Sequence, residues 1–443
     1  MNIYALSSGR GPSGIAIIRL SGKNTLKISK LITKKNNLKS KEANLCKFYN
    51  PSNDKIIDEG LLILFSEPNS YTGEDLAEFH IHGSNAVVNC FLEVLSEQEN
   101  CRLAEPGEFT KLAFQNNKMD LIEAESIGDL IHAETELQRE QAIKLVQGSA
   151  SNYYNSLREK LVKSLSYIEA KIDFAEDDLP QNVLREVQNS IKEVYLDIKK
   201  ILEDQKIGEK IRDGFRISIV GQVNTGKSSL LNLLSKREAA IVSEEEGTTR
   251  DVIETYLNID GYPVILADTA GIRKAKNKVE KEGIKRAIKK AKNADLILVM
   301  FDVSKKTISK DLKKLINKNC ILVFNKSDLS KKNPKIEFKK NDQILISVKN
   351  NKNIDKLIKI IKDKLSKKFM RSKTVLVTRE RHRVKLNAAL KEIEKFLKKD
   401  QSKEIETAAE DLRLATRHLG SIIGKVDVEE ILGSIFKDFC IGK

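Results

Sequence analysis

The stretch Gly221-Gln222-Val223-Asn224-Thr225-Gly226-Lys227-Ser228 decides the fold of the middle of this chain. A β-branched run, 215–220, precedes it, and a leucine-rich segment with helical character, 229–234, follows it. A strand, a glycine-bracketed loop and a helix are the context in which the G-x-x-x-x-G-K-[ST] pattern binds phosphate. The backbone N–H groups of such a loop and the positive end of the helix surround the phosphates. We expect Lys227 to reach the β- and γ-phosphates and Ser228 to bind Mg²⁺.

Two motifs that contact phosphate and metal follow in the order that a GTP-binding switch domain requires. Gly247-Thr248-Thr249-Arg250-Asp251 offers a threonine hydroxyl to Mg²⁺. Asp268-Thr269-Ala270-Gly271 comes at the end of an apolar strand. There the aspartate can hold the metal through water, and the Gly271 N–H can sense the γ-phosphate.

Two later motifs are expected to read the base. Asn325-Lys326-Ser327-Asp328 follows an apolar strand, 321–324. The Asp328 carboxylate can accept hydrogen bonds from guanine N1–H and from the exocyclic amine, a pattern that adenine lacks, so GTP is favoured over ATP. Ser347-Val348-Lys349, after another strand, can close over the base. Together the motifs predict a site for GTP and Mg²⁺.

The sequence lacks one group that many switch GTPases use in catalysis. They place a glutamine directly after the D-T-A-G segment to orient the attacking water, and here that position is Ile272. Another group must therefore act, and the candidates are Glu280, Arg250, Arg273 or a second cation. Asn224 is placed to give an oxygen ligand to a monovalent cation beside the phosphates. For Glu280 the alternative is a solvated residue at the start of a helix.

Length and cysteine content limit the class of protein. A chain of 443 residues is too long for a single core, so about two to four domains are expected. Five cysteines without a C-x-x-C pair favour a reducing compartment over a disulfide framework. Nothing reads as a signal peptide, and the longest apolar stretch, 294–303, is too short to cross a bilayer. We expect a cytoplasmic protein without a membrane partner.

The formal net charge of +15 is concentrated in residues 213–371. One interpretation is electrostatic attraction to RNA. The other is a set of solvated lysine faces, which the scarcity of aromatic residues among the lysines favours.

Residues 1–118 have an α+β pattern. The strand-like runs are 14–20, 60–65 and the alternating 77–82, and a helix is expected at 85–97. His80 and His82 share one face of their strand and could bind a metal. Because no third ligand is nearby in the sequence, an ordinary sheet position is favoured for both.

The remaining segments predict an insertion. Residues 119–212 and 372–443 are helical, with amphipathic helices at 154–170, 183–202, 383–398, 405–419 and 428–439. Between them, residues 213–371 alternate strands (215–220, 253–259, 263–267, 296–301, 321–324, 344–346) with helices (227–234, 281–292, 306–317, 354–368). This order predicts a mostly parallel sheet covered on both faces. The predicted class is therefore multidomain, α+β and α/β, with an α/β domain inserted into a helical one.

With these motifs the chain resembles the MnmE (TrmE) family of bacterial tRNA modification GTPases over nearly its whole length. The segments that carry the resemblance are Ile18–Gly22, Ser70–Asp75, Pro106–Thr110, Lys118–Leu121, Gly247–Asp251 and Phe439–Lys443. The last contains a cysteine four residues from the carboxyl end. Four positions depart from the family pattern, namely Ser84, Leu112, Val223 and Ile423.

The resemblance implies an activity and its partners. The amino-terminal domain would bind 5-formyl-tetrahydrofolate, or methylene-tetrahydrofolate, and form a homodimer. Together with the flavoprotein MnmG, in a heterotetramer, the chain would add a carboxymethylaminomethyl or aminomethyl group at C5 of the wobble uridine of certain tRNAs. Potassium would promote the pairing of two Ras-like G domains and GTP hydrolysis.

The resemblance also implies residue roles. Arg19, Glu78, Lys118 and Lys443 match folate-contacting positions, and folate's glutamate tail and pterin amines need such cations and such a carboxylate. The catalytic candidates are Glu280, which matches a water-orienting glutamate, Arg250 and Cys440. For Cys440 a lowered thiol pKa with Lys443 as its cause is one interpretation, and a small hydrophobe in a helix-terminal core is the other.

The full set of predicted nucleotide and metal residues is as follows. GTP-binding positions are Asn224, Thr225, Gly226, Lys227, Ser228, Ser229, Ser243, Glu244, Glu245, Glu246, Gly247, Thr248, Thr249, Asp268, Thr269, Ala270, Gly271, Asn325, Lys326, Ser327, Asp328, Ser347, Val348 and Lys349. Mg²⁺ would be bound by Ser228 and Thr249, and K⁺ by Asn224, Ser243, Glu245 and Thr248.

Two other functions compete with the enzyme interpretation. An RNA- or ribosome-binding assembly GTPase would use the switch only to regulate docking, but no appended RNA-binding module is recognisable and Cys440 would be idle. A purely structural dimerising scaffold would leave the guanine-reading segment 325–328 without a purpose.

Overall fold

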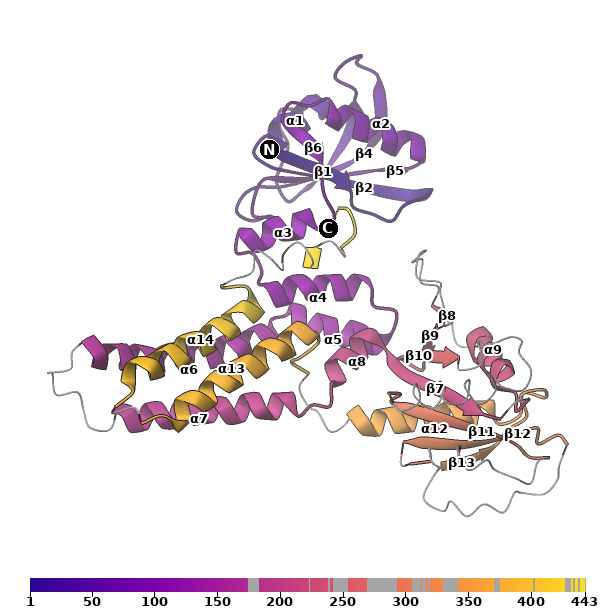
Figure 1. Cartoon of the computed structure of the whole chain (residues 1–443). Coiled ribbons are helices and arrows are strands. Elements are labelled where there is room, and N and C mark those ends of the chain that lie inside the picture. Colours follow the sequence, from indigo (N-terminus) through magenta and orange to yellow (C-terminus); the bar gives the residue numbers. More distant parts are fainter. Residues whose placement is uncertain are drawn as a thin grey trace, which may run out of the picture. The chain divides into compact units, whose positions relative to one another are not determined.

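The computed structural model describes residues 1–173, 183–222, 224–237, 240–241, 254–268, 293–304, 312, 316–317, 319–329, 342–369, 375–400, 403–426, 432, 435–436 and 439–442. These residues form two compact units. The first comprises 1–128, 145–192 and 391–443, and the second comprises 129–144 and 193–390. Figure 1 labels most elements of both.

The elements follow one another along the chain with these bounds. They are β1 (Asn2–Leu6), β2 (Ser13–Ser21), α1 (Thr25–Thr33), β3 (Ala43–Tyr49), β4 (Ile56–Phe65), β5 (Leu76–Gly83), α2 (Asn85–Ser96), β6 (Cys101–Leu103), α3 (Glu108–Gln115), α4 (Leu121–Ile131), α5 (Glu136–Val146), α6 (Ser149–Asp173), α7 (Val183–Leu202), α8 (Ile207–Asp213), β7 (Phe215–Gly221), α9 (Lys227–Arg237), β8 (Ala240–Ile241), β9 (Glu254–Ile259), β10 (Tyr262–Asp268), β11 (Leu296–Asp302), β12 (Cys320–Asn325), β13 (Asp342–Leu345), α12 (Ile354–Phe369), α13 (Glu380–Lys398) and α14 (Ile405–Ile423).

The first unit contains a six-stranded sheet in the order β3-β4-β5-β2-β1-β6. Its neighbouring strands are antiparallel, except for the parallel pair β1 and β6. Phe79 of β5 is buried with Phe48 and Phe91, at ring-centroid distances of 5.7 and 4.9 Å. Because side chains alternate along a strand, its neighbours Glu78 and His80 lie on the opposite face. The face of the sheet that carries Glu78 and His80 is therefore available to bind a polar ligand.

The helices of the first unit bring distant segments of the chain together. Helix α6 and helix α14 lie side by side, although more than two hundred residues separate them (Figure 1). Each has a buried apolar stripe at helical spacing, which includes Leu157 and Leu161 on α6 and Leu412 and Leu419 on α14.

The second unit contains a seven-stranded sheet in the order β13-β12-β11-β7-β10-β9-β8. The five strands from β13 to β10 run parallel, whereas β9 and β8 are added antiparallel at one edge. Every residue of β11 and β12 is buried. Such fully buried, mostly apolar strands are typical of a parallel sheet with both faces covered. The loops that follow β7 and β12 therefore meet at one edge, the carboxyl end of the strands.

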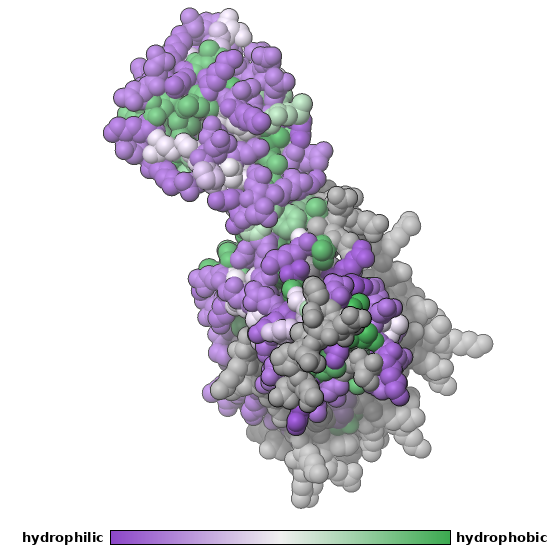
Figure 2. Space-filling model, turned by 90° about the vertical axis from the view of Figure 1, so that its left-hand side faces the viewer, coloured by the Kyte–Doolittle hydropathy of each residue, from purple (hydrophilic) through white to green (hydrophobic). Residues whose placement is uncertain are grey.

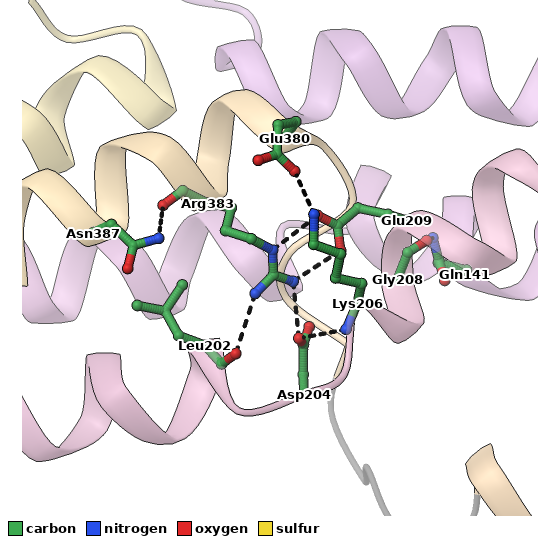
Figure 3. Close-up of polar contacts among 9 residues, drawn as sticks. All are labelled: Gln141, Leu202, Asp204, Lys206, Gly208, Glu209, Glu380, Arg383 and Asn387. Carbon is green, nitrogen blue, oxygen red and sulfur yellow. Dashed lines mark hydrogen bonds and ion pairs between the residues drawn. The ribbon is translucent and has the colours of Figure 1, made fainter. Parts of the chain in front are cut away.

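Helix α8 and residues 375–378 flank this sheet in sequence and pack against its core. Ile207 and Ile211 of α8 are buried in the same apolar cluster as Phe215, and Val375 packs on that cluster. Gly208 approaches the second segment so closely that a Cβ there would lie 2.1 Å from the carbonyl oxygen of Val377. A buried set of ion pairs around Arg383 joins α8 to the start of α13 (Figure 3).

The predicted class, α+β and α/β in several domains, is confirmed. The predicted strands of the α/β block all appear with bounds shifted by one or two residues, and β8 is an addition. In the first unit β1, β3, β6, α1 and α3 were not predicted. The predicted helices 281–292, 306–317 and 428–439 lie wholly or mostly outside the described residues.

Two of the departures from the family pattern have a structural role here. The Ser84 hydroxyl caps α2 by accepting a hydrogen bond from the Val87 N–H, which satisfies one of the free donors at a helix start. Ile423 is buried at the end of α14. Val223 lies outside the described residues.

Within the described part of the chain, no helix combines the length and the apolar character that a membrane crossing needs. On the face of the amino-terminal domain at the top of Figure 2, hydrophilic side chains predominate and hydrophobic ones gather in smaller groups.

Candidate functional site

The phosphate loop lies between the end of β7 and the start of α9. Asn224 and Gly226 have left-handed backbone angles, with φ of 63° and 95°. A Cβ at Gly226 would lie 2.3 Å from Asn325 Nδ2, so only glycine fits this close approach. Lys227 Nζ donates to the carbonyls of Gly221 and Gln222 at 3.1 and 2.9 Å. The lysine ammonium is thus fixed over the loop, where a phosphate would meet it.

The other residues of the loop divide into structural and accessible ones. Thr225 is buried, and its hydroxyl donates to the Gln222 carbonyl at 2.9 Å. Ser228 and Ser229 are exposed in the first turn of α9, and Asn224 is exposed in the loop itself. The hydroxyl of Ser228 and the amide oxygen of Asn224 can therefore reach a cation beside the loop.

Asn325 links the phosphate loop to the base-reading segments. Its Nδ2 donates to the Thr225 carbonyl at 2.8 Å, and its Oδ1 accepts from the Val348 N–H at 3.1 Å. Asn325 is itself buried at the end of β12. The structure thus brings three of the predicted motifs into direct contact.

The carboxylate of Asp328 is oriented by a residue from the next loop. Ser347 is buried, and its hydroxyl donates to Asp328 Oδ1 at 2.6 Å. This hydrogen bond, together with a backbone N–H, holds the pKa of Asp328 below its usual value. Asp328 is exposed, as is Lys349. An ionised, oriented acceptor is what the donors of a guanine edge require.

Asp302 belongs to this site and was not predicted. It ends β11, is 5% exposed, and pairs with Lys326 at a Nζ–Oδ2 distance of 2.6 Å. The Ser304 N–H and hydroxyl donate to its other oxygen. Burial alone would raise the pKa of Asp302, but these donors outweigh it and lower that pKa. An aspartate at the end of a wholly apolar strand was the sequence signal that could have identified it.

Many predicted positions lie outside the described residues. They are Ser243, Glu244, Glu245, Glu246, Gly247, Thr248, Thr249, Arg250, Thr269, Ala270, Gly271, Ile272, Arg273, Glu280 and Lys443. Asp268 is the last residue of β10, where its backbone pairs with Ile219 of β7, which precedes the phosphate loop.

In the first unit, the strand register brings Arg19 and Glu78 together. They are direct neighbours across β2 and β5. Arg19 Nη2 and Nε donate to Glu78 Oε1 at 2.7 and 3.1 Å. The guanidinium also lies against the rings of Tyr71 and Phe109, at 5.3 and 5.5 Å from their centroids. A half-buried cation and carboxylate in an aromatic frame can bind a flat, polar heterocycle.

Lys118 has a different environment on the same domain. It is exposed, and its ammonium donates to the Pro68 carbonyl at 2.8 Å. A Cβ at Gly73 would lie 3.3 Å from its Cγ and Cδ atoms, so the lysine stem runs along this turn.

The two histidines of β5 differ in their contacts: His82 is hydrogen-bonded, whereas the buried Nε2 of His80 has no hydrogen-bond partner among the described residues. His82 Nδ1 pairs with Asp58 at 2.8 Å, and His80 Nε2 lies 3.9 Å from Glu78. In the part of the chain that the structure describes, no three His, Cys, Asp or Glu side chains gather as a metal site.

Cys440 lies in a carboxyl-terminal segment that packs on the first unit. Its carbonyl accepts from the Gly107 N–H at 3.4 Å, and Ile441 forms an antiparallel bridge with Pro106. All five cysteines are free thiols, and Cys440 is exposed whereas Cys46 and Cys320 are buried. The interpretation of Cys440 as a core side chain is therefore wrong.

A phosphate loop on a parallel sheet, joined to a guanine-reading segment, defines a GTP-binding protein of the P-loop class. Two family models match the chain, the GTP-binding protein TrmE N-terminus over residues 2–118 and the MnmE helical domain over residues 121–440. The chain therefore belongs to the MnmE (TrmE) family of GTPases.

Curated relatives cover the whole chain. It is 57% identical to the tRNA modification GTPase MnmE of Pelagibacter ubique, over 100% of both chains. It is 44% identical to the protein of the same name from Rickettsia bellii, over 100% of this chain and 99% of that one.

Solved structures match a smaller part. The G domain of the T. maritima FeoB iron transporter is 21% identical, with 35% of this chain and 98% of that chain covered and a TM-score of 0.26. Aquifex aeolicus Era is 26% identical, with 40% and 66% covered and a TM-score of 0.25.

Proposed function

We propose that this chain couples GTP hydrolysis to the modification of tRNA at C5 of the wobble uridine. It acts as a homodimer with a flavoprotein partner and takes a one-carbon unit from a formyl- or methylene-tetrahydrofolate. Its substrate places it in the cytoplasm. The observation that carries the proposal is the exposed thiol of Cys440 on the same compact unit as the Arg19–Glu78 pair. A GTPase that only regulated docking would need neither the exposed thiol nor the Arg19–Glu78 pair.

The domains follow the boundaries that the sequence indicates. Residues 1–118 bind the folate and dimerise, 119–212 and 372–443 form the helical domain, and 213–371 form the inserted G domain. The matched ranges 2–118 and 121–440 support the first of these boundaries. The contact of α8 with the apolar core of the G domain supports a firm connection on the amino-terminal side of the insertion.

The proposed nucleotide site uses the residues described above. Lys227 binds the phosphates, Asp328 accepts hydrogen bonds from guanine, and Lys326 and Lys349 flank the base. Asn325 positions these groups through its contacts to Thr225 and Val348.

Oxygen atoms at the phosphate loop are suitable ligands for two cations. The exposed Ser228 hydroxyl, with Thr249, is a suitable ligand for Mg²⁺, and the exposed Asn224 amide, with Ser243, Glu245 and Thr248, for K⁺. When bound, they neutralise charge that develops on the phosphates. Arg250 and Glu280 are the proposed groups that contact the reacting phosphate and water.

The proposed folate site centres on Arg19 and Glu78. The carboxylate suits the amines of a pterin ring, and the cations Lys118 and Lys443 suit its glutamate tail. Tyr71 and Phe109 add apolar surface around the guanidinium of Arg19. These residues bind and orient the ligand, and Cys440 is the nucleophile candidate nearby in the fold.

The proposal is tested by analysing the tRNA of a deletion strain in which the Cys440→Ser variant is the only copy of this protein. We expect mass spectrometry of tRNA nucleosides to show loss of the modified wobble uridine, whereas purified Cys440→Ser still hydrolyses GTP at the normal rate. Cys90→Ser, a half-buried thiol elsewhere in the same unit, is the matched control. Unchanged modification in the Cys440→Ser strain would overturn the proposal.

A further inference from the structure

In the carboxyl-terminal segment 440–442, which we call the tail, two side chains donate hydrogen bonds to one backbone carbonyl. Ser7 Oγ donates to the Gly442 carbonyl at 2.9 Å, and Arg19 Nη1 donates to the same oxygen at 3.2 Å. These residues are more than four hundred positions apart in the sequence. The two hydrogen bonds therefore fix the tail to the sheet of the first unit.

Gly442 allows the tail to approach the sheet this closely. It is buried and has a φ of 96°. A Cβ there would lie 2.3 Å from the Leu6 carbonyl oxygen and 2.8 Å from the Ser7 Cα. Any other residue would be strained in its backbone and would push the tail away from the end of β1.

Ser7 is itself rigidly placed. Its N–H donates to the Ile17 carbonyl at 2.8 Å, which closes the connection between β1 and β2. Beside it, the Ser8 hydroxyl accepts from the Ile17 N–H at 3.1 Å and has a different partner from Ser7. The Ser7 hydroxyl is thus a fixed donor aimed at the tail, whereas the Ser8 hydroxyl serves the hairpin.

Apolar packing alone does not fix the tail in one position. Ile441 is only half buried, and it packs on the small cluster of Ile3, Ala5, Ala104 and Phe109. Leu112 packs on the same cluster. A half-buried side chain can slide along an apolar surface. The backbone of the tail is held by the Gly107–Cys440 hydrogen bond and the Ile441–Pro106 bridge, and beyond them by the two hydrogen bonds to the Gly442 carbonyl.

We propose that Ser7 is a positioning residue for Cys440. With Arg19 it binds the Gly442 carbonyl, and it thereby holds the thiol two residues earlier at a fixed place on the amino-terminal domain. Because the same Arg19 guanidinium binds Glu78, a ligand that engages Glu78 also acts on the tail through one intervening side chain. This inference rests on the proposed role of Cys440 in the modification reaction.

The first measurement is physical and uses the full chain. A carboxypeptidase trims a released tail faster than an anchored one. We expect Ser7→Ala to raise the trimming rate about three- to tenfold, the effect of one lost hydrogen bond. Ser8→Ala is the matched control and should trim at the normal rate. Gly442→Ala should trim at least as fast as Ser7→Ala, and Ser7→Thr, which keeps the hydroxyl, should restore slow trimming.

The second measurement is the reaction. After induced synthesis of each variant in a deletion strain, the modified wobble uridine should appear about three- to tenfold more slowly with Ser7→Ala than with Ser8→Ala or Ser7→Thr. The thermal midpoint and GTP turnover of Ser7→Ala should match those of the control.

The outcomes separate this inference from the proposed function. Normal trimming of Ser7→Ala would overturn the anchoring. Fast trimming with a normal modification rate, while Cys440→Ser is inactive, would overturn the positioning role and leave the proposed function intact. An active Cys440→Ser would overturn the proposed function, and with it the positioning role of Ser7, even if the tail is anchored.

Discussion

At the scale of single residues, Asp328 shows how a surface carboxylate is prepared for a base. It is exposed, yet its direction is set by the buried Ser347 hydroxyl, which donates to one of its oxygens. A side chain fixed in this way loses less conformational entropy when a ligand binds. Lys326, two residues earlier, is fixed in turn by the buried Asp302. The base-reading segment is thus oriented before any nucleotide arrives.

The change Asp328→Asn tests this assignment. The amide replaces an acceptor by a donor, which would face the donors of guanine. Because hydrogen bonds to a charged group contribute about 1.5–3 kcal/mol each, GTP affinity should fall about 100-fold or more. Xanthosine triphosphate, which has a carbonyl in place of the exocyclic amine, should bind the variant better than GTP does.

Titration with fluorescent nucleotides measures both affinities. Asp342→Asn is the control, since Asp342 pairs with Lys364 at the edge strand β13 of the same unit. An Asp328→Asn protein that keeps its preference for GTP over xanthosine triphosphate would contradict the assignment.

At the scale of elements, α8 and the start of α13 are joined by one buried arginine. Arg383 Nε and Nη2 donate to the two oxygens of Glu209 at 2.9 and 2.8 Å, and Nη2 also reaches Asp204 at 2.8 Å (Figure 3). A third nitrogen donates to the Leu202 carbonyl at 3.2 Å. The hydrogen bonds of Glu209 and then Asp204 raise the pKa of Arg383, which therefore stays charged.

This cluster fixes the chain where it passes into and out of the sheet of the second unit. The exposed pair Lys206–Glu380, at 2.9 Å, lies beside the buried one and spans the same two segments (Figure 3). The two pairs thus offer a comparison between a buried and an exposed ion pair at one place in the fold.

The change Arg383→Met should destabilise α8 strongly. It keeps the apolar length of the side chain but leaves the buried Glu209 and the half-buried Asp204 without their cation. Loss of one partner of a buried ion pair costs about 3–5 kcal/mol, whereas an exposed pair contributes about 0–1 kcal/mol. Hydrogen exchange of the α8 and β7 amides in the full chain should therefore show much faster opening in Arg383→Met and little change in the control Lys206→Met. Equal protection in the two variants would contradict a stabilising role for the cluster.

The elements that could be predicted from the sequence are those whose apolar pattern fits only one type of secondary structure. Strands β7, β11 and β12 are short, mostly apolar runs followed by polar motifs, so their bounds were found within one or two residues. Strand β1 was missed because it has only five residues, and β3 was missed because most of its residues are exposed or half-buried, so its apolar pattern is weak. The sequence indicates that the segment of α8 is helical. Helical spacing alone, however, does not show which hydrophobic core the apolar residues of the helix pack against.

The same limit applies to the site. Motif residues such as Lys227 and Asp328 can be identified because their chemistry needs a fixed spacing. Asp302 and Ser7 belong to no motif, and only the fold brings them to Lys326 and to Gly442. Long-range polar contacts of this kind depend on strand order and register, which one sequence does not reveal.

At the scale of the whole molecule, charge opposes the association of two copies. The net charge of +15 makes two chains repel, and the excess lies in the segment that is proposed to pair. Any salt screens this repulsion, with a Debye length of about 8 Å at physiological ionic strength. A specific effect of potassium must therefore be separated from simple screening. Sodium at the same concentration screens equally well but is a smaller ion.

The change Asn224→Gly removes the proposed potassium ligand without straining the loop. Asn224 has a φ of 63°, which glycine adopts freely and alanine does not, so the usual alanine variant would alter the backbone as well. In the normal chain, GTP turnover and light-scattering mass with GDP and aluminium fluoride should both rise when potassium replaces sodium at constant ionic strength. In Asn224→Gly both should stay at the sodium level, while Asn224→Asp, which keeps an oxygen and tolerates the left-handed conformation, should retain part of the response. Equal stimulation of Asn224→Gly and the normal chain would show that the ion acts elsewhere.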